Sequence, residues 1–367
     1  MKTIRDVAGA VKSWLLGPHA QIAEGSHRGG VVGWLNARSE PVFVYPESTG
    51  YYLTWLAFLT KLPDSAGDAA GHAAEAIQWI SRYLSEDMNP PTRIYLSGNP
   101  ADDWRNHGTF AFDLAMLARG MAQHVPGNTQ GPGALAQLFD LLLPFCGEDD
   151  SIQAFRPHAG CPAASPQPGW SSCCGAYQTK LAAAILLAHS ISEAPARLHV
   201  AADRTYRRWR EYSRCQALDG NTHSAFYHLE GLVLAGAAGW DPDATDFARD
   251  AFLKGLRTPG SPCRSADSFY GTPLNCRSDV CAQALRLGCM LRSRNVSTDR
   301  GLDPALRGLA EALQTFIGDN GAVRFSHQNG ARHYNVWCAM FAHQALCFYD
   351  SVQNGKAPDD GWLRLLV

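Results

Sequence analysis

Six stretches of this chain resemble one another, and their repetition constrains the fold more than any single motif does. Each begins with polar or aromatic residues and continues as an apolar segment rich in alanine and leucine. The stretches start 49 to 67 residues apart, at Ser48, His107, Cys174, His223, Arg277 and His333. Each gap has room for a second, amphipathic helix, and one more precedes the first stretch. A period this long is typical of helix pairs that bury their apolar faces against neighbouring pairs.

The apolar and amphipathic segments have different patterns, which predict their places in the fold. Segments 174–190 and 278–290 are apolar on most faces, as buried helices are. Segments 65–86 and 303–316 carry one apolar stripe, as helices that cover a core do. Six buried helices inside six one-sided helices form an all-α (α/α)6 toroid. The aromatic last repeat favours a closed ring over a linear solenoid, which needs polar end caps, so we expect one domain over residues 1–367.

The lengths of the connections predict where a binding site lies. Links from an apolar helix to the next amphipathic helix are short, whereas most links in the other direction are long and rich in Gly, Pro, Trp and Arg. Long loops in a compact domain are usually functional. They lead to the N-termini of the apolar helices, which present free N–H groups and a partial positive charge. We expect one deep cleft there, rimmed by short β pieces such as 40–45 and 321–325.

Composition limits the classes of partner and the compartment. A net charge of -2 gives no general attraction to nucleic acid or to an anionic membrane. The longest clean apolar run, 181–188, is too short to span a bilayer, and Lys12 interrupts the N-terminal apolar stretch, which disfavours a secretion signal. Eleven cysteines without a CxxC motif favour a reduced, cytoplasmic protein. The basic and aromatic run 204–214 is interpreted as the solvated face of an outer helix.

Five residues near the predicted cleft are candidates for acid/base chemistry. Glu47 lies at the start of the first apolar helix, where a carboxylate can act as a general acid or base. The fourth apolar helix carries His228 and Glu230, which need hydrogen-bonding partners or a water-filled cavity if they are buried. Asp279 lies at the start of the fifth apolar helix, and His333 lies at the mouth beside the sixth.

A second set of aromatic, amide and basic residues is predicted to bind substrate. An indole beside carboxylates and arginine offers a flat apolar face with hydrogen-bonding groups around it, which suits a sugar. Residues three and four apart share a helix face, and Arg286 on such a face would hold an acidic group if the substrate is a uronate. The candidates are Tyr51, Trp104, Arg105, His107, Trp170, Tyr177, Gln178, His223, Tyr227, Gln283, Arg286, Tyr334 and Trp337.

The adjacent Cys173 and Cys174 raise two further hypotheses at the start of the third apolar helix. A thiol at a helix N-terminus can be activated as a nucleophile, and cysteines together with a histidine can ligate zinc. The sequence has no zinc-finger spacing and no specific glycine-rich phosphate loop. We therefore predict no metal and no cofactor.

The chain as a whole resembles the six-hairpin, sugar-active (α/α)6 enzymes over nearly its full length. Segment 223–232, His-Ser-Ala-Phe-Tyr-His-Leu-Glu-Gly-Leu, is similar to a helix of N-acylglucosamine 2-epimerase relatives, and this resemblance implies that His228 and Glu230 face the sugar. Unsaturated glucuronyl hydrolases share the fold class and protonate a vinyl ether with an aspartate, a role that the resemblance offers to Asp113 or Asp279. The chain also looks like uncharacterised proteins associated with exopolysaccharide synthesis.

These observations favour a carbohydrate-active enzyme with a small-molecule or oligosaccharide substrate. The first hypothesis is a glycoside hydrolase, which needs two facing carboxyl groups. The second is sugar epimerisation or β-elimination, which needs a base and an acid near one C–H, as His/Glu or His/Tyr pairs supply. A third is a toroid cyclase, a dehydratase or a thiol-dependent transferase. A fourth is a glycan-binding protein without catalytic activity.

Overall fold

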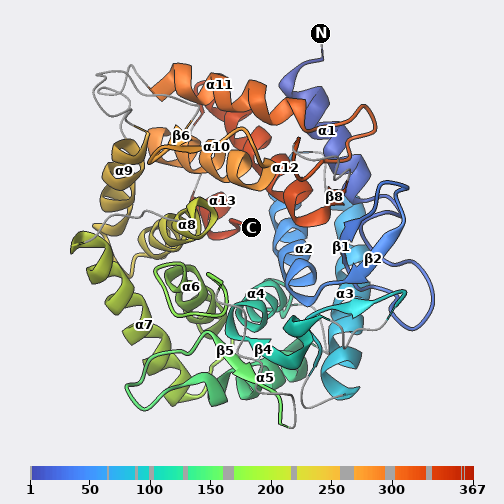
Figure 1. Cartoon of the computed structure of the whole chain (residues 1–367), viewed down its shortest axis with the longest axis vertical. Helices are drawn as coiled ribbons and strands as arrows, with labels where there is room; N and C mark the ends of the chain where they lie inside the picture. The colour runs from blue at the N-terminus through green and yellow to red at the C-terminus, as the bar shows by residue number, and fades with distance from the viewer. Residues whose placement is uncertain are drawn as a thin grey trace.

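Figure 1 shows the chain as a ring of helices, in a computed structural model. The helices form an inner and an outer layer, and the chain alternates between the two. This arrangement confirms the predicted all-α (α/α)6 toroid with short strands in its loops. The structure describes residues 2–63, 66–86, 90–98, 103–126, 131–159, 169–215, 221–256, 268–293, 302–327, 333–356, 358 and 360–367.

The inner layer contains the six predicted apolar helices. Every residue of the first two, α2 (Pro46–Leu59) and α4 (Ala111–Ala122), is buried, because these segments are apolar on nearly all sides. The others are α6 (Gln178–His189), α8 (Thr222–Ala238), α10 (Ser278–Ser293) and α12 (Val336–Gln353). No helix in the described ranges combines the length and apolarity needed to cross a membrane.

The outer layer contains helices with one buried side and one exposed side. In α11 (Leu302–Thr315) the buried residues recur at helical spacing, as the single apolar stripe predicts. α1 (Ile4–Leu15) begins with a capping box, in which Thr3 and Asp6 satisfy each other's backbone N–H groups. The remaining outer helices are α3 (Ala66–Glu86), α5 (Gly131–Leu142), α7 (Ala196–Cys215) and α9 (Ala244–Gly255).

The ring closes because the last inner helix, α12, packs against both α10 and α2. The first outer helix, α1, also packs on α12. Neighbouring inner helices approach closely at glycines. A Cβ atom at Gly120 would lie 2.3 Å from the backbone oxygen of Gly50, and one at Gly231 would lie 2.4 Å from the backbone nitrogen of Lys180. Larger residues at these positions would therefore push the inner helices apart.

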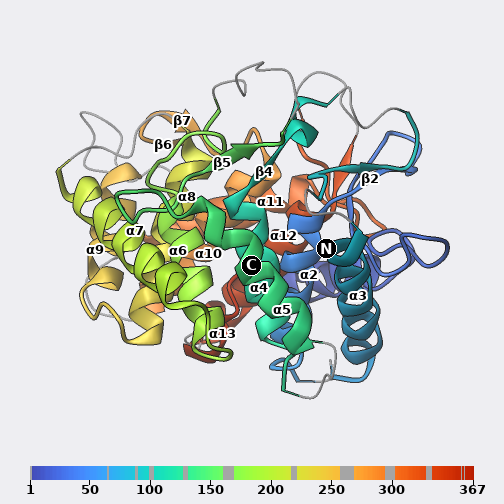
Figure 2. The ribbon, with the colours of Figure 1, turned by 90° about the horizontal axis from the view of Figure 1, so that it is seen from below.

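Short strands lie at one end of the ring, the upper end in Figure 2. A four-stranded antiparallel sheet has the order β3-β2-β1-β8, with β1 (Val32–Leu35), β2 (Pro41–Val44), β3 (Ile94–Tyr95) and β8 (Tyr334–Asn335). Two smaller sheets pair β4 (Gly108–Phe110) with β5 (Phe155–Pro157) and β6 (Ser268–Phe269) with β7 (Thr272–Pro273). The predicted β piece 40–45 contains β2, whereas 321–325 makes isolated bridges without a regular strand.

The short helix α13 (Asp360–Arg364) lies at the opposite end of the ring, the lower end in Figure 2, and residues 365–367 run from it into the interior. Figure 1 places this end of the chain near the centre of the ring. All three residues are buried. Lys180 Nζ donates a hydrogen bond to the backbone oxygen of Val367 at 3.0 Å, and the side-chain amide of Gln344 bonds to the backbone of this segment through both its oxygen and its nitrogen. The inner helices therefore surround a filled core.

Candidate active site

A cavity of about 200 Å³ opens at the N-terminal ends of the inner helices, where the loop lengths predict a cleft. Its wall consists of the first turns of α2, α4, α8, α10 and α12 and of the loops before them. The described residues that line it are Tyr45, Glu47, Ser48, Tyr51, Thr92, Arg93, Arg105, Phe110, Phe112, Asp113, Trp170, Ser171, His223, Tyr227, Arg277, Asp279, Phe325 and Trp337.

Two carboxyl groups from adjacent inner helices, Glu47 on α2 and Asp113 on α4, line this cavity. Burial raises the pKa of both, and the charge of Glu47 raises the pKa of Asp113 further, well above its usual range. Hydrogen bonds from Tyr45 and Tyr51 oppose the rise at Glu47. Asp113 Oδ2 is buried without a hydrogen-bond partner among the described residues. The pair therefore retains a proton at pH values where a solvated carboxyl group has lost it, and the proton favours Asp113.

Asp279, in the first turn of α10, is a third carboxyl group of the cavity and has the opposite electrostatics. Its oxygens accept hydrogen bonds from Arg277 Nε at 3.1 Å and from the backbone N–H of Val280 at 2.8 Å. His223 Nδ1 lies 3.6 Å from its Oδ2. Burial raises the pKa of Asp279, but these partners outweigh burial and leave the pKa below its usual value. Asp279 is therefore ionised at neutral pH.

Arg93 and Arg105 form a basic part of the wall, and both pair with the carboxylate of Asp103. Arg93 Nη1 lies 3.2 Å from Asp103 Oδ2, and Arg105 Nη1 lies 3.0 Å from Oδ1. The charge of Arg93 also lowers the pKa of the cavity carboxyl groups on α2 and α4, although burial has the larger, opposite effect. Arg93 thus limits how far burial raises the pKa of these two groups.

Aromatic rings provide most of the flat apolar surface. The hydroxyl groups of Tyr51 and Tyr227 lie 2.9 Å apart. The Trp170 ring meets the Tyr227 ring at a centroid distance of 5.7 Å and the His223 ring at 5.4 Å. The ammonium group of Lys180 lies 4.3 Å from the centroid of the Tyr227 ring. Flat apolar faces with polar groups between them are the surface that a sugar ring requires.

The structure brings part of the predicted site together. The residues that it brings to the cavity come from all six repeats, because each repeat contributes either the first turn of its inner helix or the loop before that turn. They are Glu47, Tyr51, Arg105, Trp170, His223, Tyr227, Asp279 and Trp337.

His228 and Glu230 lie deeper along α8 and are not among the residues that line the cavity. Both are fully buried in contacts with neighbouring inner helices. His228 Nδ1 lies 3.1 Å from Thr179 Oγ1, and burial lowers the pKa of His228 to about 4. Glu230 forms ion pairs with Lys180, at 2.7 Å, and with Arg286. The geometry therefore gives both residues hydrogen-bonding roles within the helix ring.

Four further residues that were predicted to bind substrate make contacts inside the fold and do not line the cavity. Gln283 acts behind the cavity, because its Oε1 lies 2.7 Å from Nδ1 of His223. Arg286 is fully buried in its ion pair with a glutamate of α8, so it does not reach a ligand in the cavity. Tyr177 and Gln178 donate hydrogen bonds to backbone oxygens of the preceding loops, at 3.1 and 2.7 Å.

The remaining candidates lie in the loops at the strand end, outside the cavity lining. His333 stacks on Trp34 with ring centroids 5.1 Å apart. Tyr334 belongs to β8, which pairs with β1. Trp104 and His107 belong to the 3₁₀ helix η2 (Trp104–His107), which precedes β4. These four residues therefore belong to the sheet and loops around the mouth and do not line the cavity.

Cys173 and Cys174 are exposed and do not line the cavity. Cavity geometry therefore offers no support for a thiol nucleophile. Within the described ranges, no three His, Cys, Asp or Glu side chains gather into a cluster that could hold a metal ion.

Some residues that line the cavity are not among the candidates that the sequence predicts. The sequence indicates Asp113 only through a family resemblance. An acidic residue in the first turn of an otherwise apolar helix is also a signal in itself, because burial of a carboxyl group is costly and indicates a function. Arg93 follows Pro90 and Pro91 in a loop without periodicity, and we find no sequence signal for it. Ser48 is similar: its Oγ is buried in the cavity wall without a hydrogen-bond partner among the described residues.

No protein-family model and no curated protein matches the sequence. Solved structures share its fold over almost the full length. A D-mannose isomerase superposes with a TM-score of 0.67 at 11% identity, over 96% of this chain and 97% of that one. Cellobiose 2-epimerase from Bacillus thermoamylovorans B4167 gives 0.67 at 10% identity, over 94% and 98%. The GH76A α-1,6-mannanase from Salegentibacter sp. HEL1_6 gives 0.57 at 10% identity, over 95% and 99%.

The chain therefore has the six-hairpin (α/α)6 toroid fold of these solved structures. Its structural neighbours are enzymes of several reaction classes: isomerases and epimerases, glycoside hydrolases and a type II terpene cyclase. Identities this low establish the fold and not the reaction, because one fold hosts many chemistries.

Proposed function

We propose that this chain is a carbohydrate-active enzyme that hydrolyses a glycosidic bond in the cavity at the inner-helix N-termini. The observation that carries the proposal is the carboxyl pair Glu47 and Asp113, which lines one cavity and retains a proton because both groups are buried. Neighbouring carboxyl groups whose surroundings push their pKa values apart are the pattern of an acid/base pair. Glycoside hydrolysis uses such a pair.

The two carboxyl groups take different roles. Asp113 is the general acid and gives its proton to the glycosidic oxygen as the bond to the anomeric carbon breaks. Glu47 is the ionised partner, because the hydroxyls of Tyr45 and Tyr51 and two nearby cations counteract burial there. It either attacks the anomeric carbon or takes a proton from the water that does so. Water supplies the hydroxyl group of the new reducing end, and its other proton returns Asp113 to the acid form, directly if Glu47 is the nucleophile or by way of Glu47 if Glu47 is the base.

The rest of the cavity would hold and orient one sugar ring. The rings of Trp170, Tyr227 and Trp337 offer apolar faces, and ionised Asp279 with its partner Arg277 offers acceptors and donors for hydroxyl groups. The volume of about 200 Å³ is below the roughly 300–1,000 Å³ of sites for drug-sized ligands. It therefore suits one ring, with the remainder of the substrate at the mouth.

The test is a ¹H NMR time course in D₂O with α- and β-linked di- and trisaccharides. α-1,6-Mannotriose comes first, because an inactive variant of the α-1,6-mannanase with this fold is in complex with it. We expect new reducing-end signals with the wild type, and a rate lower by about 10²–10⁴-fold in Asp113→Asn and in Glu47→Gln. Asp319→Asn, which changes a fully exposed carboxylate, is the control. Full activity in both cavity variants would sink the assignment, as would an absence of cleavage across the panel.

Epimerisation is a second candidate, and His223 is the observation that favours it. Burial lowers the pKa of His223, so its imidazole is neutral and can accept a proton. Its ring centroid lies 4.4 Å from that of Tyr227, whose hydroxyl could return the proton. The same NMR experiment separates the two reactions. Epimerisation exchanges a carbon-bound proton for deuterium and leaves the linkage intact, and His223→Gln should abolish the exchange.

A further inference from the structure

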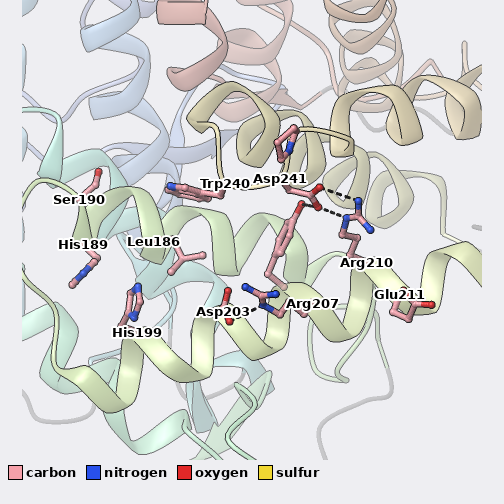
Figure 3. A pocket seen from close by; sticks show the side chains of 12 residues that line it. Leu186, His189, Ser190, His199, Asp203, Arg207, Arg210, Glu211, Trp240 and Asp241 are labelled. Atoms are coloured by element: carbon pink, nitrogen blue, oxygen red, sulfur yellow. Dashed lines mark hydrogen bonds and ion pairs between the residues drawn. The ribbon is translucent and has the colours of Figure 1, made fainter.

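A second hollow lies on the outside of the ring, between α7, the end of α6 and the turn from α8 to α9 (Figure 3). It encloses about 730 Å³ and includes Leu186, His189, His199, Arg207, Trp240 and Asp241 in its lining. We name it the outer groove. The 17 residues of α8 span about 25 Å, and the cavity and the outer groove lie at opposite ends of this helix. The two are therefore separate sites.

Trp240 gives the outer groove an aromatic face. It follows Gly239, whose left-handed φ of 81° ends α8 and turns the chain outward. The side chain of Trp240 is 41% exposed, although an indole is usually buried against the core. The rings of His189 and His199, which lie 4.4 Å apart, line the same hollow. An accessible indole with imidazoles nearby is a surface for stacking a ring.

Exposed apolar side chains gather on the segments that bound the outer groove. Among the described large apolar residues, the exposed ones are Leu96, at 37% and next to β3, and Ile191, Val200, Tyr212 and Trp240, at 39 to 43%. Ile191 follows the end of α6, Val200 and Tyr212 lie on α7, and Trp240 lies on the turn after α8. Trp240 lines the outer groove, whereas Ile191, Val200 and Tyr212 do not. Trp240 is therefore the one of these exposed side chains that the groove offers to a ligand.

Both arginines of the outer groove are already paired with carboxylates of the groove. Arg207 Nε lies 2.8 Å from Asp203 Oδ2. Arg210 forms an ion pair with Asp241 (dashed in Figure 3). Asp241 also accepts a hydrogen bond from the Tyr206 hydroxyl at 3.0 Å. A phosphate or another anion would have to displace these carboxylates from the arginines. The arginines that the run 204–214 contributes to the groove, Arg207 and Arg210, are therefore neutralised by carboxylates and do not form an anion-binding strip.

The chemistry of the outer groove selects the class of ligand. A protein partner is disfavoured, because the centre of a protein interface is depleted of charged residues and this groove contains two ion pairs. Carboxylate and guanidinium groups side by side can accept from and donate to neighbouring hydroxyl groups, while Trp240 covers the C–H face of a sugar ring. We propose that the outer groove binds a segment of a neutral polysaccharide chain.

This inference deepens the proposed function, since it rests on that function for its catalytic meaning: the substrate would be a polymer. A chain held in the outer groove stays close to the cavity, which raises its effective concentration there. Binding itself needs no turnover and is measured separately. The catalytic variant Asp113→Asn should therefore bind polymer as the wild type does, whether or not the proposed reaction is right.

The experiment is native gel electrophoresis of the full chain through gels that contain yeast α-mannan, dextran, hydroxyethylcellulose or arabinoxylan, with alginate as an anionic polymer. We expect at least one neutral polymer to retard the wild type. Trp240→Ala should raise the apparent Kd by roughly 2- to 10-fold, which corresponds to the loss of one ring contact, and Trp240→Phe should restore part of it. Tyr212→Ala is a matched control, because Tyr212 is also 41% exposed and does not line the groove.

Three results would overturn the proposal. The first is that no neutral polymer retards the wild type. The second is equal weakening in Trp240→Ala and Tyr212→Ala. The third is retardation by alginate that exceeds every neutral polymer and depends on Trp240, which would make the ligand an anion. Sedimentation of the wild type and Trp240→Ala tests the protein-interface alternative, because a self-association lost only in the variant would assign the groove to a second copy of the chain.

Discussion

Glu230→Gln should be among the most destabilising isosteric substitutions in this chain. Glu230 pairs with Lys180 at 2.7 Å and with Arg286, and all three side chains are fully buried. Glutamine keeps the volume but leaves two buried cations without their counter-charge. Removing one partner of a buried ion pair typically costs about 3–5 kcal/mol. We expect a loss in this range from the free energy of unfolding.

The loss should also depend on pH, because Lys180 can release its proton and Arg286 cannot. Burial lowers the pKa of Lys180 to about 7 in the wild type, while Glu230 raises it. Without Glu230 the pKa of folded Lys180 drops below 7, whereas in the unfolded chain it is normal. Below pH 7 the unfolded variant therefore binds one proton more than the folded variant does. As the pH decreases below 7, the free energy of unfolding of the variant should therefore decrease by about 1.4 kcal/mol per pH unit relative to that of the wild type.

Urea unfolding at pH 8, 7 and 6, followed by circular dichroism, measures both effects. The control is Asp303→Asn, which removes the partner of Arg292 in a pair whose side chains are 29% and 48% exposed. Such a pair contributes less than about 1 kcal/mol, with little change over this pH range. The reasoning is refuted if Glu230→Gln costs no more than Asp303→Asn, or if its cost is the same at all three pH values.

Three further predictions concern packing, pH and catalysis. Gly231→Ala should lower the unfolding free energy by about 1–3 kcal/mol, because its Cβ would meet the backbone of α6 at 2.4 Å; Gly71→Ala, with open space around it, should raise stability by about 0.5–1 kcal/mol, both measured by urea unfolding. Burial lowers the pKa of His228 and His343 to about 4 and about 3. Between pH values of about 6.5 and 4 the unfolded chain therefore binds more protons than the folded chain, and thermal melts should show stability decreasing as the pH decreases over this range. A stability that does not change with pH would contradict the burial of neutral imidazoles. Arg93→Gln should move the acidic limb of the pH–rate profile to higher pH, because Arg93 lowers the pKa of both carboxyl groups of the proposed acid/base pair; an unmoved limb would remove Arg93 from that role.

The fold could be predicted because its signal is repeated. Each inner helix is apolar on nearly all sides, each outer helix has one stripe, and the long loops precede the inner helices. Because the same pattern occurs six times, an irregularity in one repeat does not obscure the prediction. Segment 321–325 forms only isolated bridges, because its partners are close in sequence: Val323 pairs with Ile317 and Arg324 pairs with Tyr334. Such short loops leave no room for a regular strand.

The predicted residues that reach the cavity lie in the first two turns of the inner helices or in the loops before them, as Tyr227 and Trp170 do. Glu47, His223 and Asp279 reach the cavity because the N-terminus of an inner helix faces it from any rotation of the helix. Beyond the first turn, the rotation of the helix about its own axis determines whether a side chain faces the cavity. α8 is apolar on all sides and has no stripe that would reveal its rotation. The positions of His228 and Glu230 depend on partners in other repeats, which no local pattern encodes.

The contact between α1 and α12 has a consequence for synthesis on the ribosome. The apolar face of α1 includes Val11, Trp14 and Leu15, which are buried in the finished ring. Its partner α12 begins about 320 residues later. At the usual rate of translation, roughly 15–65 s pass between the synthesis of α1 and that of α12. An open helical array would let each new repeat settle on the last. This ring instead leaves the face of α1 that packs on α12 uncovered until α12 has been synthesised, and an apolar surface exposed in this way favours aggregation.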